Sequence, residues 1–341
     1  MTTIYGLPQI EIRALGAVQE SRPVALLTGR ESWNVVSTAF NELPLVVQAE
    51  PLNAERAYLD TLADSLPQQV EVIYGVGGGL VCDVAKYIGW RRKLPVTLIP
   101  TALSVDGFFT PIVAVRENGS VNYADTGPAA RVFIDWEIIR SAPPDIRGTG
   151  IVEILSIVTG LLDWRLAAER GRNLPAHRFQ PWAAAIAATI AQQAFKIAKG
   201  VGAGRVESLQ ELLDLICMEV QLTNQLGHTR PQEGAEQYFA YAIEPKVTRG
   251  GRGIPYSDLV GPGILIAAAL HGQDVAPIRE TISNAGARLG QLRPDDILST
   301  LRTLPEFVKD HNLPYSILNE IDPYSDKVTN ILSLTGLDMM R

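Results

Sequence analysis

The sequence predicts an α/β domain built on a parallel sheet, followed by an all-helical domain. Short apolar runs alternate with helical patterns up to about residue 140, whereas helical periodicity fills nearly everything after about residue 149. Pro143 and Pro144 interrupt the chain between these two textures. Because 341 residues at about 100–200 residues per domain favour two domains, we place them at 1–148 and 149–341.

Apolar runs bounded by turn residues predict the strands of the first domain. The expected strands are 24–29, 45–50, 70–76, 96–100, 112–115 and 131–135. Helical patterns at 31–41, 53–66 and 80–90 separate the first four strands. Nearly continuous apolar strands that alternate with helices are typical of a parallel sheet with helices on both faces. The sequence Glu117-Asn118-Gly119-Ser120 predicts a turn between the last two strands.

Periodic apolar positions predict the helices of the second domain. The expected helices are 150–170, 180–201, 206–226, 233–244, 258–271, 276–290, 294–311 and 323–336. No internal repeat and no low-complexity segment interrupts them.

Composition and charge exclude several classes of partner. The net charge is −7 and no run of Lys or Arg occurs, which argues against nucleic acid and against an anionic membrane. The N-terminus lacks the pattern of a signal peptide, and no apolar run reaches the roughly 18 residues of a membrane span. Cys82 and Cys217 are too few for a disulfide framework and are expected to be free thiols. We therefore expect a cytoplasmic protein with a small-molecule substrate, either monomeric or a homo-oligomer.

The third predicted strand ends in Gly75-Val76-Gly77-Gly78-Gly79, and a helix follows at once. Adjacent glycines let the backbone turn sharply and approach a ligand closely, while the start of a helix offers free N–H groups and a positive dipole end. These features suit a phosphate. The spacing is not GxGxxG, and a plain strand-to-helix turn is the alternative. Three contiguous glycines exceed what such a turn needs, which favours a pyrophosphate site.

Several motifs together resemble the iron-containing alcohol dehydrogenase superfamily, and in particular its glycerol-1-phosphate dehydrogenases. Residues 77–86 resemble the signature GGGxxxDxAK, and 100–107 resemble the segment PTxxSxDG. Residues 135–143, 163–167, 230–236 and 312–318 carry further motifs in the family order. The resemblance implies a dehydroquinate synthase-like fold, with a Rossmann-like first domain, a helical domain that completes an interdomain cleft, and NAD or NADP as cofactor.

The resemblance also implies roles for individual residues. Gly77, Gly78 and Gly79 would hold the pyrophosphate of the cofactor. Asp83 and Thr101 would support that loop and the nicotinamide side. Ser104 and Asp106 would lie where the nicotinamide meets the substrate. Simpler alternatives exist, since Asp83 near a helix start is equally a capping carboxylate and Asp106 equally a turn-forming residue.

Glu50 ends the second predicted strand, where doubly wound dinucleotide folds hold the adenosine ribose through an acidic side chain. An acid at this position favours NAD over NADP. A surface carboxylate before Pro51 is the alternative reading.

The dehydrogenases of this family hold a divalent metal with one Asp and two His, and the metal promotes loss of the substrate hydroxyl proton. The matching positions here carry Glu153, Gln237 and Tyr256, which form a poor zinc site. The histidines of the chain fall at none of these positions, and structural roles are expected for all of them: His177, His228, His271 and His311. Among them, His271 is expected to face the dipole at a helix end, and His311 resembles a packed position of the family. We therefore predict that the chain lacks the family's catalytic metal, although oxygen donors leave Mg²⁺ or Ca²⁺ open.

A second departure concerns phosphate recognition. Asp125 lies near the position where relatives often carry a lysine, which weakens the case for a phosphorylated substrate. Replacement charge is available from Lys246, Arg249 and Arg252, in a segment that reads either as a solvated loop or as an anion-binding lid.

These observations favour an NAD(P)-dependent oxidoreductase that acts on a small polyol or polyol phosphate. Its substrate pocket would be lined by Asp106, Glu153, Gln237 and Tyr256, with Tyr256 or Glu153 taking the hydroxyl proton. One alternative is an inactive homologue that still binds a nucleotide. The other is a sugar-phosphate cyclase, although those relatives also need the metal.

Overall fold

The computed structural model describes residues 3–40, 42–248 and 254–339, and the chain divides into two compact units. The first unit ends at Pro143 and the second begins at Pro144. The short helix α5 (Pro144–Arg147) therefore belongs to the helical unit, although the sequence analysis drew the boundary after it. The Arg147 guanidinium explains this membership, because it donates to the carbonyl oxygens of Val201 (3.0 Å) and Gly202 (2.6 Å) in that unit.

The first unit contains a six-stranded parallel sheet in the order β1-β8-β5-β4-β2-β3. Its strands are β1 (Gln9–Ile12), β2 (Val24–Thr28), β3 (Leu45–Ala49), β4 (Val72–Gly77), β5 (Val96–Pro100) and β8 (Arg131–Ile134). Three helices connect the central strands: α1 (Arg30–Val36), α2 (Arg56–Ser65) and α3 (Gly79–Arg92). The predicted class, a parallel α/β domain plus a helical domain, is confirmed.

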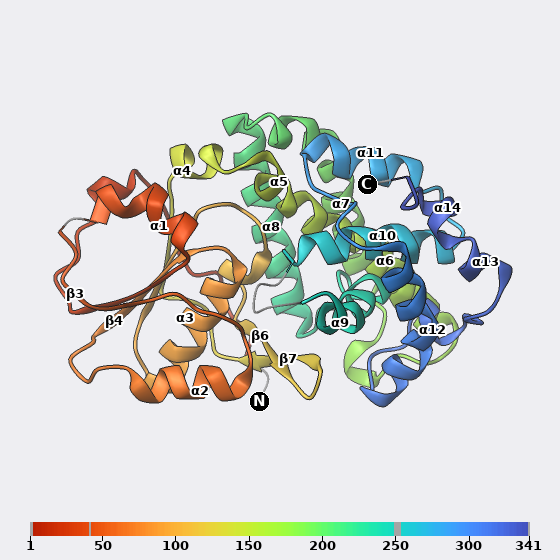
Figure 1. The fold of residues 1–341 in the computed structure, drawn as a ribbon, viewed down its shortest axis with the longest axis horizontal. Helices are drawn as coiled ribbons and strands as arrows, with labels where there is room; N and C mark the ends of the chain where they lie inside the picture. Colours follow the sequence, from red (N-terminus) through yellow and green to blue (C-terminus); the bar gives the residue numbers. More distant parts are fainter. Residues whose placement is uncertain (1–2, 41, 249–253, 340–341) are drawn as a thin grey trace. The chain divides into compact units, whose positions relative to one another are not determined.

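The strand order places a topological switch point between β2 and β4. The chain leaves β2 toward β3 and then returns past β2 to β4. Since such crossovers are right-handed, α1 covers one face of the sheet and α2 covers the other together with α3, as Figure 1 shows. Ligands of open α/β sheets bind beyond the carboxyl ends of the strands at such a point. The turn that follows β4 is the glycine turn, Gly77–Gly79.

Burial of apolar side chains on both faces stabilises this sheet. The cluster on the α1 face contains Leu15, Val24, Leu26, Val36, Val72, Tyr74, Val76, Ile99 and Phe133. On the opposite face, α3 approaches β4 unusually closely at Gly75, where an added Cβ would lie 2.8 Å from the Cβ of Ala85 and 2.9 Å from Cδ2 of Leu98. Gly75 therefore sets how closely the helix that carries the glycine turn packs on the sheet.

Two strands were not predicted. The edge strand β1 has only four residues, too short for a clear periodic signal, and it is defined by its pairing with β8. Strand β7 (Ser120–Asp125) pairs antiparallel with β6 (Ile112–Glu117) through the predicted turn at Asn118 and Gly119, both with positive φ. This hairpin forms a separate two-stranded sheet.

The second unit is helical in its described part. Its longer helices are α6 (Thr149–Glu169), α7 (Pro181–Gly202), α8 (Val206–Leu226), α9 (Ala235–Val247), α10 (Ser257–Leu270), α11 (Ala276–Ala285) and α12 (Pro294–Asp310). Helix α10 is buried along its whole length from Asp258 to Leu270, as expected for a helix that is apolar on every side.

Two helix predictions were wrong in extent. The helix expected at 276–290 ends at Ala285, because Gly286 adopts a left-handed conformation (φ 86°) that closes it. The helix expected at 323–336 is two short helices, α13 (Asp326–Thr329) and α14 (Ile331–Thr335), interrupted at Asn330. An amphipathic pattern does not reveal such an interruption, because Asn330 is not a strong helix breaker.

Candidate functional site

The glycine turn leaves open space above the first turn of α3. Gly77 has φ 150°, a backbone conformation that residues other than glycine rarely adopt. Gly78 caps α3 without a side-chain hydrogen bond, and a Cβ added to it would meet no atom within 4 Å. The first backbone N–H groups of a helix lack intrahelical acceptors. The turn thus combines free donors, the positive dipole end of a 14-residue helix and room for a ligand.

The neighbouring strand and helix support this turn. The Thr101 N–H donates to the carbonyl oxygen of Gly77 (3.2 Å), so the end of β5 is tied to the end of β4. The hydroxyl groups of Thr101 and Ser32 lie 3.3 Å apart, and Ser32 on α1 also borders Gly77. Sequence analysis missed Ser32. A signal existed, because Thr28-Gly29 followed by a helix is a second strand-to-helix turn.

Glu50 is exposed directly after β3 and lies beside the start of α1. Its Oε1 accepts a hydrogen bond from the Arg30 N–H (3.3 Å) and lies 3.9 Å from the position of an added Cβ on Gly29. The carboxylate therefore sits at the carboxyl ends of the two strands on the β3 side of the switch point. An acid at this place can accept hydrogen bonds from a ribose.

Asp83 and Asp106 interact in the first unit. Asp83 lies on α3 and Asp106 starts the 3-10 helix η3 (Asp106–Phe108). Burial raises the pKa of Asp83 to about 6; Lys86 and Arg116 oppose this shift, and Asp106 adds to it. The Ala114 N–H also hydrogen-bonds to Asp83. Asp83 therefore faces the segment from Asp106 to Arg116, while Ser104 is half-buried in the loop that leads to it.

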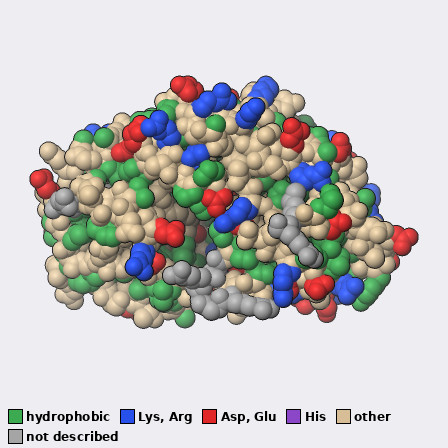
Figure 2. Space-filling model, turned by 45° about the horizontal axis from the view of Figure 1, so that its top comes forward, with side chains coloured by type: hydrophobic (Ala, Val, Ile, Leu, Met, Phe, Trp, Pro, Cys, Tyr) green, Lys and Arg blue, Asp and Glu red, His purple; other side chains and the backbone are tan. Residues whose placement is uncertain are grey.

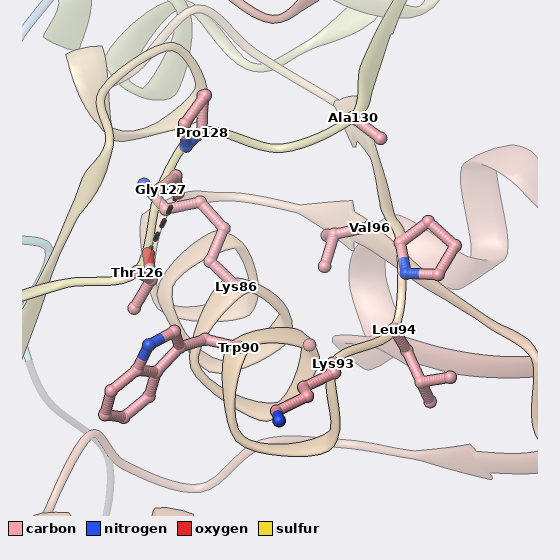
Figure 3. A pocket seen from close by; sticks show the side chains of 11 residues that line it. Lys86, Trp90, Lys93, Leu94, Val96, Thr126, Gly127, Pro128 and Ala130 are labelled. Atoms are coloured by element: carbon pink, nitrogen blue, oxygen red, sulfur yellow. Dashed lines mark hydrogen bonds between the residues drawn. The ribbon is translucent and has the colours of Figure 1, made fainter. Parts of the chain in front are cut away.

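A cavity of about 350 Å³ lies at the amino-terminal ends of β5 and β8, the ends opposite to the glycine turn. Figure 3 shows Trp90 and Lys93 from the end of α3 and Thr126 to Pro128 before β8 around it. None of the residues predicted for the cofactor or the substrate lines this cavity. Because ligands of parallel α/β sheets bind at the carboxyl ends of the strands, the glycine turn remains the stronger candidate.

In the helical unit, the structure brings Gln237 and Tyr256 together. Gln237 is buried on α9, and Tyr256 stands immediately before α10. The Tyr256 hydroxyl donates to Oε1 of Gln237 (2.9 Å). The Tyr256 ring stacks on Tyr241, with ring centroids 6.4 Å apart and planes 24° apart. These contacts hold the phenol in one orientation.

Glu153 lies on α6 and is half-buried. A carboxylate oxygen of Glu153 lies within 4.8 Å of one from Glu219, a buried residue of α8 that sequence analysis missed. The signal for Glu219 was its spacing, because it follows Leu212 and Ile216 on the apolar stripe of α8. A glutamate on a buried stripe indicates a role other than solubility.

A buried aspartate connects four segments of the helical unit. Asp163 on α6 accepts hydrogen bonds from the N–H groups of Ala235 (2.7 Å) and Ile317 (2.6 Å), and Nε2 of His271 lies 2.8 Å from its Oδ1. His271, expected only to face a helix dipole, therefore pairs with an acid. Because Ala235 opens α9, Asp163 also fixes the start of the helix that carries Gln237.

The carboxyl group of Glu236 is buried beside this aspartate. Burial and then the charge of Asp163 raise the pKa of Glu236 to about 8. Glu236 accepts from the Gly234 N–H (2.8 Å), and its Oε2 lies 2.7 Å from Oγ1 of Thr159, whose hydroxyl can also donate to the Ser156 carbonyl. A protonated Glu236 can donate to Thr159, which satisfies every group in this network.

We predict that Glu236→Gln makes the protein more stable at pH 8 but not at pH 4. Between about pH 4.5 and 8 the unfolded state has an ionised Glu236 while the folded state keeps it protonated, so unfolding releases a proton and stability falls as pH rises. Glutamine keeps the neutral form. The stability difference between variant and wild type should grow by about 1.4 kcal/mol per pH unit across this window. Urea denaturation at several pH values measures it; a difference independent of pH would contradict the assignment.

The remaining residues singled out in the sequence have structural surroundings. His177 and His228 lie against each other and Trp164, and burial, His177 and Arg230 lower the pKa of His228 to about 4. Nδ1 of His311 lies 2.9 Å from the Phe307 carbonyl oxygen. Both cysteines are free, and burial raises the pKa of each thiol.

Two charged features bear on phosphate recognition. Asp125 ends β7, where the Gly127 N–H and the Tyr5 hydroxyl donate to it. Lys246 donates to the Thr300 hydroxyl (3.0 Å) and so packs against α12. Arg249 and Arg252 lie outside the described residues.

On the face of the molecule drawn in Figure 2, acidic and basic side chains are interspersed. Within the described part of the chain, no helix combines the length and the apolar character that crossing a membrane requires.

The fold resembles that of glycerol dehydrogenases and iron-containing alcohol dehydrogenases of known structure. Residues 14–143 match the profile of the family described as iron-containing alcohol dehydrogenase. The structure resembles glycerol dehydrogenase from Schizosaccharomyces pombe with a TM-score of 0.68 at 18% identity, over 98% of this chain and 91% of that one.

The sequence is similar to glycerol-1-phosphate dehydrogenases [NAD(P)+]. That of Thermoplasma acidophilum is 28% identical over 320 residues, which cover 91% of this chain and 86% of the relative. That of Methanothrix thermoacetophila is 29% identical over 246 residues, which cover 72% and 67%. The chain is thus distantly similar in sequence to glycerol-1-phosphate dehydrogenases.

Proposed function

We propose that this protein is an NAD(P)-dependent oxidoreductase that moves hydride between the nicotinamide and a small polyol or polyol phosphate. The observation that carries the proposal is the glycine turn at the switch point, with open space above Gly78 and the free amides of α3 beneath it. The named activity of the relatives, a glycerol-1-phosphate dehydrogenase using NAD(P)⁺, agrees with it.

The residues of the first unit fit such a dinucleotide. Gly77, Gly78 and Gly79 would face its pyrophosphate, with Thr101 and Ser32 holding the turn from β5 and α1. Glu50 would accept hydrogen bonds from the adenosine ribose, and a carboxylate there would repel the 2′-phosphate of NADP. We therefore propose NAD as the preferred cofactor. When bound, the cofactor supplies the hydride acceptor.

The residues at the family's metal position do not fit a catalytic zinc or iron. Gln237 would offer its carbonyl oxygen, but that oxygen already accepts the hydrogen bond of the Tyr256 phenol. Tyrosine binds metal well only as a phenolate, so Glu153 would be the single anionic ligand of the three. Structural and catalytic zinc sites use at least three strong nitrogen, sulfur or carboxylate ligands.

Metal analysis tests this mismatch. The protein purified without chelator and dialysed against metal-free buffer is expected to hold less than about 0.1 zinc, iron or nickel per chain, because the three positions offer one strong ligand instead of three. Elemental analysis by mass spectrometry measures the content. About one tightly held ion per chain would overturn the proposal of metal-independent chemistry.

Oxidation of an alcohol moves a hydride from carbon to the nicotinamide and a proton from the hydroxyl to a base. In place of the metal, we propose Glu153 or Tyr256 as the group that takes this proton. Tyr256→Phe removes only the phenol hydroxyl, and Glu153→Gln removes only the charge. Whichever variant loses turnover while dinucleotide affinity persists identifies the base.

Initial rates with NAD⁺ and NADH decide the function. We expect turnover on glycerol, dihydroxyacetone or their phosphates, with no gain from added zinc. A second candidate is an inactive homologue that kept the glycine turn, which the loss of metal ligands favours. Calorimetric titration with NADH separates the two candidates. Binding without turnover on any of these compounds supports the inactive homologue, and absence of NADH binding excludes both candidates.

A further inference from the structure

Lys86 is a buried cation that holds a loop by its carbonyl groups. Its side chain, on α3, is 2% exposed. The ammonium group donates to the carbonyl oxygens of Gly107 (2.8 Å), Thr110 (2.9 Å) and Ile112 (2.6 Å). The three N–H donors are shared among these carbonyl groups and the Thr110 hydroxyl (3.3 Å), so polar groups of the chain itself surround the charge.

This arrangement is unusual because a buried lysine is costly unless its donors are satisfied. A leucine or methionine would fill the same volume without that cost. The residues it holds begin next to Asp106, and the Sγ of Cys82 donates to the same Gly107 carbonyl (3.1 Å). Cys82 and Lys86, on two successive turns of α3, therefore both hydrogen-bond to the segment that starts at Asp106.

Helix α3 thus connects two places in the first unit. Its first residue belongs to the glycine turn, and Lys86 lies about two turns further along. A helix of this length, packed closely on β4 at Gly75, is rigid between the two points. The hydrogen bonds of Lys86 and Cys82 therefore help to set the distance from the glycine turn to Asp106.

We propose that Lys86 is a positioning residue, which fixes Asp106 relative to the cofactor turn by holding the carbonyl groups of Gly107, Thr110 and Ile112. The proposal rests on the function proposed above and on the role that the family resemblance implies for Asp106, beside nicotinamide and substrate. It assigns Lys86 no contact with either ligand.

The test uses Lys86→Met in the full chain. We expect kcat to fall by about 100-fold, since a misplacement of about 1 Å costs that much. The KM for NAD⁺ should stay within about threefold, because the lysine does not hold the glycine turn. Lys86→Arg, which keeps a cation and its N–H donors, should recover part of the loss. In hydrogen exchange, amides of 105–112 should open at least about tenfold faster while those of 77–82 do not.

Controls separate position from stability. Leu59→Ala, at a fully buried residue of α2 outside the 105–112 segment, weakens the same unit and should leave kcat within about threefold. In an Asp106→Asn background, Lys86→Met should add less than about a threefold further loss, because both act through one group.

A full additional loss in that background, or a 105–112 segment that exchanges no faster in Lys86→Met, overturns the proposal. If the wild type turns over no substrate, the proposed function fails by itself. The exchange experiment then still decides whether Lys86 holds the loop. Should Lys86→Met not fold, Lys86→Arg carries the comparison, measured both in the wild type and in the Asp106→Asn background.

Discussion

Gly78→Asp is expected to abolish dinucleotide binding while leaving the protein at least as stable. Gly78 has extended backbone angles (φ −97°, ψ −166°) that any residue adopts, and its added Cβ meets nothing. Aspartate is a favoured N-cap and would accept hydrogen bonds from the first amides of α3, which stabilises a helix by roughly a few tenths of a kcal/mol relative to glycine. Those amides are the donors proposed for the pyrophosphate. The carboxylate would occupy them and repel the phosphates.

Affinity for NADH should therefore fall at least about 100-fold, equivalent to about 2.7 kcal/mol. Calorimetry measures the affinity and thermal unfolding measures the stability. Gly16→Asp, at another glycine with no neighbour within 4 Å of an added Cβ, is the matched control and should bind normally. Unchanged NADH affinity in Gly78→Asp would show that the cofactor does not rest on this turn.

Asp163→Asn is expected to destabilise the protein by about 3 kcal/mol or more. The Asp163 carboxylate accepts from Ala235 and Ile317 and pairs with His271, with no exposed surface. Asparagine has one acceptor oxygen, so whichever way its amide points, a buried backbone N–H faces an NH₂ group. Losing one partner of a buried charged network costs about 3–5 kcal/mol.

Urea denaturation at pH 7 measures this loss, and Glu169→Gln, an exposed acid on the same helix, should change stability by less than about 0.5 kcal/mol. The variant also removes the charge that contributes to the raised pKa of Glu236. The pH dependence caused by Glu236 should accordingly shrink. A variant as stable as the wild type would mean that Asp163 does not organise the start of α9.

Much of the first unit was predictable because its signals are local. Strands that are buried on both faces must be apolar along their length, and helices between them leave a periodic pattern. The glycine turn was visible for the same reason, since a sharp turn into a helix needs residues without side chains. The edge strand β1 and the hairpin strand β7 lack such a signal, because pairing rather than burial defines them.

The partners of the polar residues were not predictable from local pattern. Sequence analysis singled out Gln237 and Tyr256, but their hydrogen bond depends on the packing of α9 and α10. It treated His271 as a helix-end residue, although its partner Asp163 lies 108 positions away. Glu219 and Ser32 became candidate site residues only through their neighbours on other elements, Glu153 and Thr101.

By itself, the sequence determined the class of fold, the order of most elements and the glycine turn, because each depends on hydrophobic periodicity and backbone freedom within about ten to twenty residues. Only the tertiary structure decided which charges are buried and what satisfies them: the lysine among three carbonyl groups, the aspartate between two amides and an imidazole, the glutamate that stays protonated. Hydrogen bonds of that kind join elements that are far apart in the chain, so no local pattern encodes them.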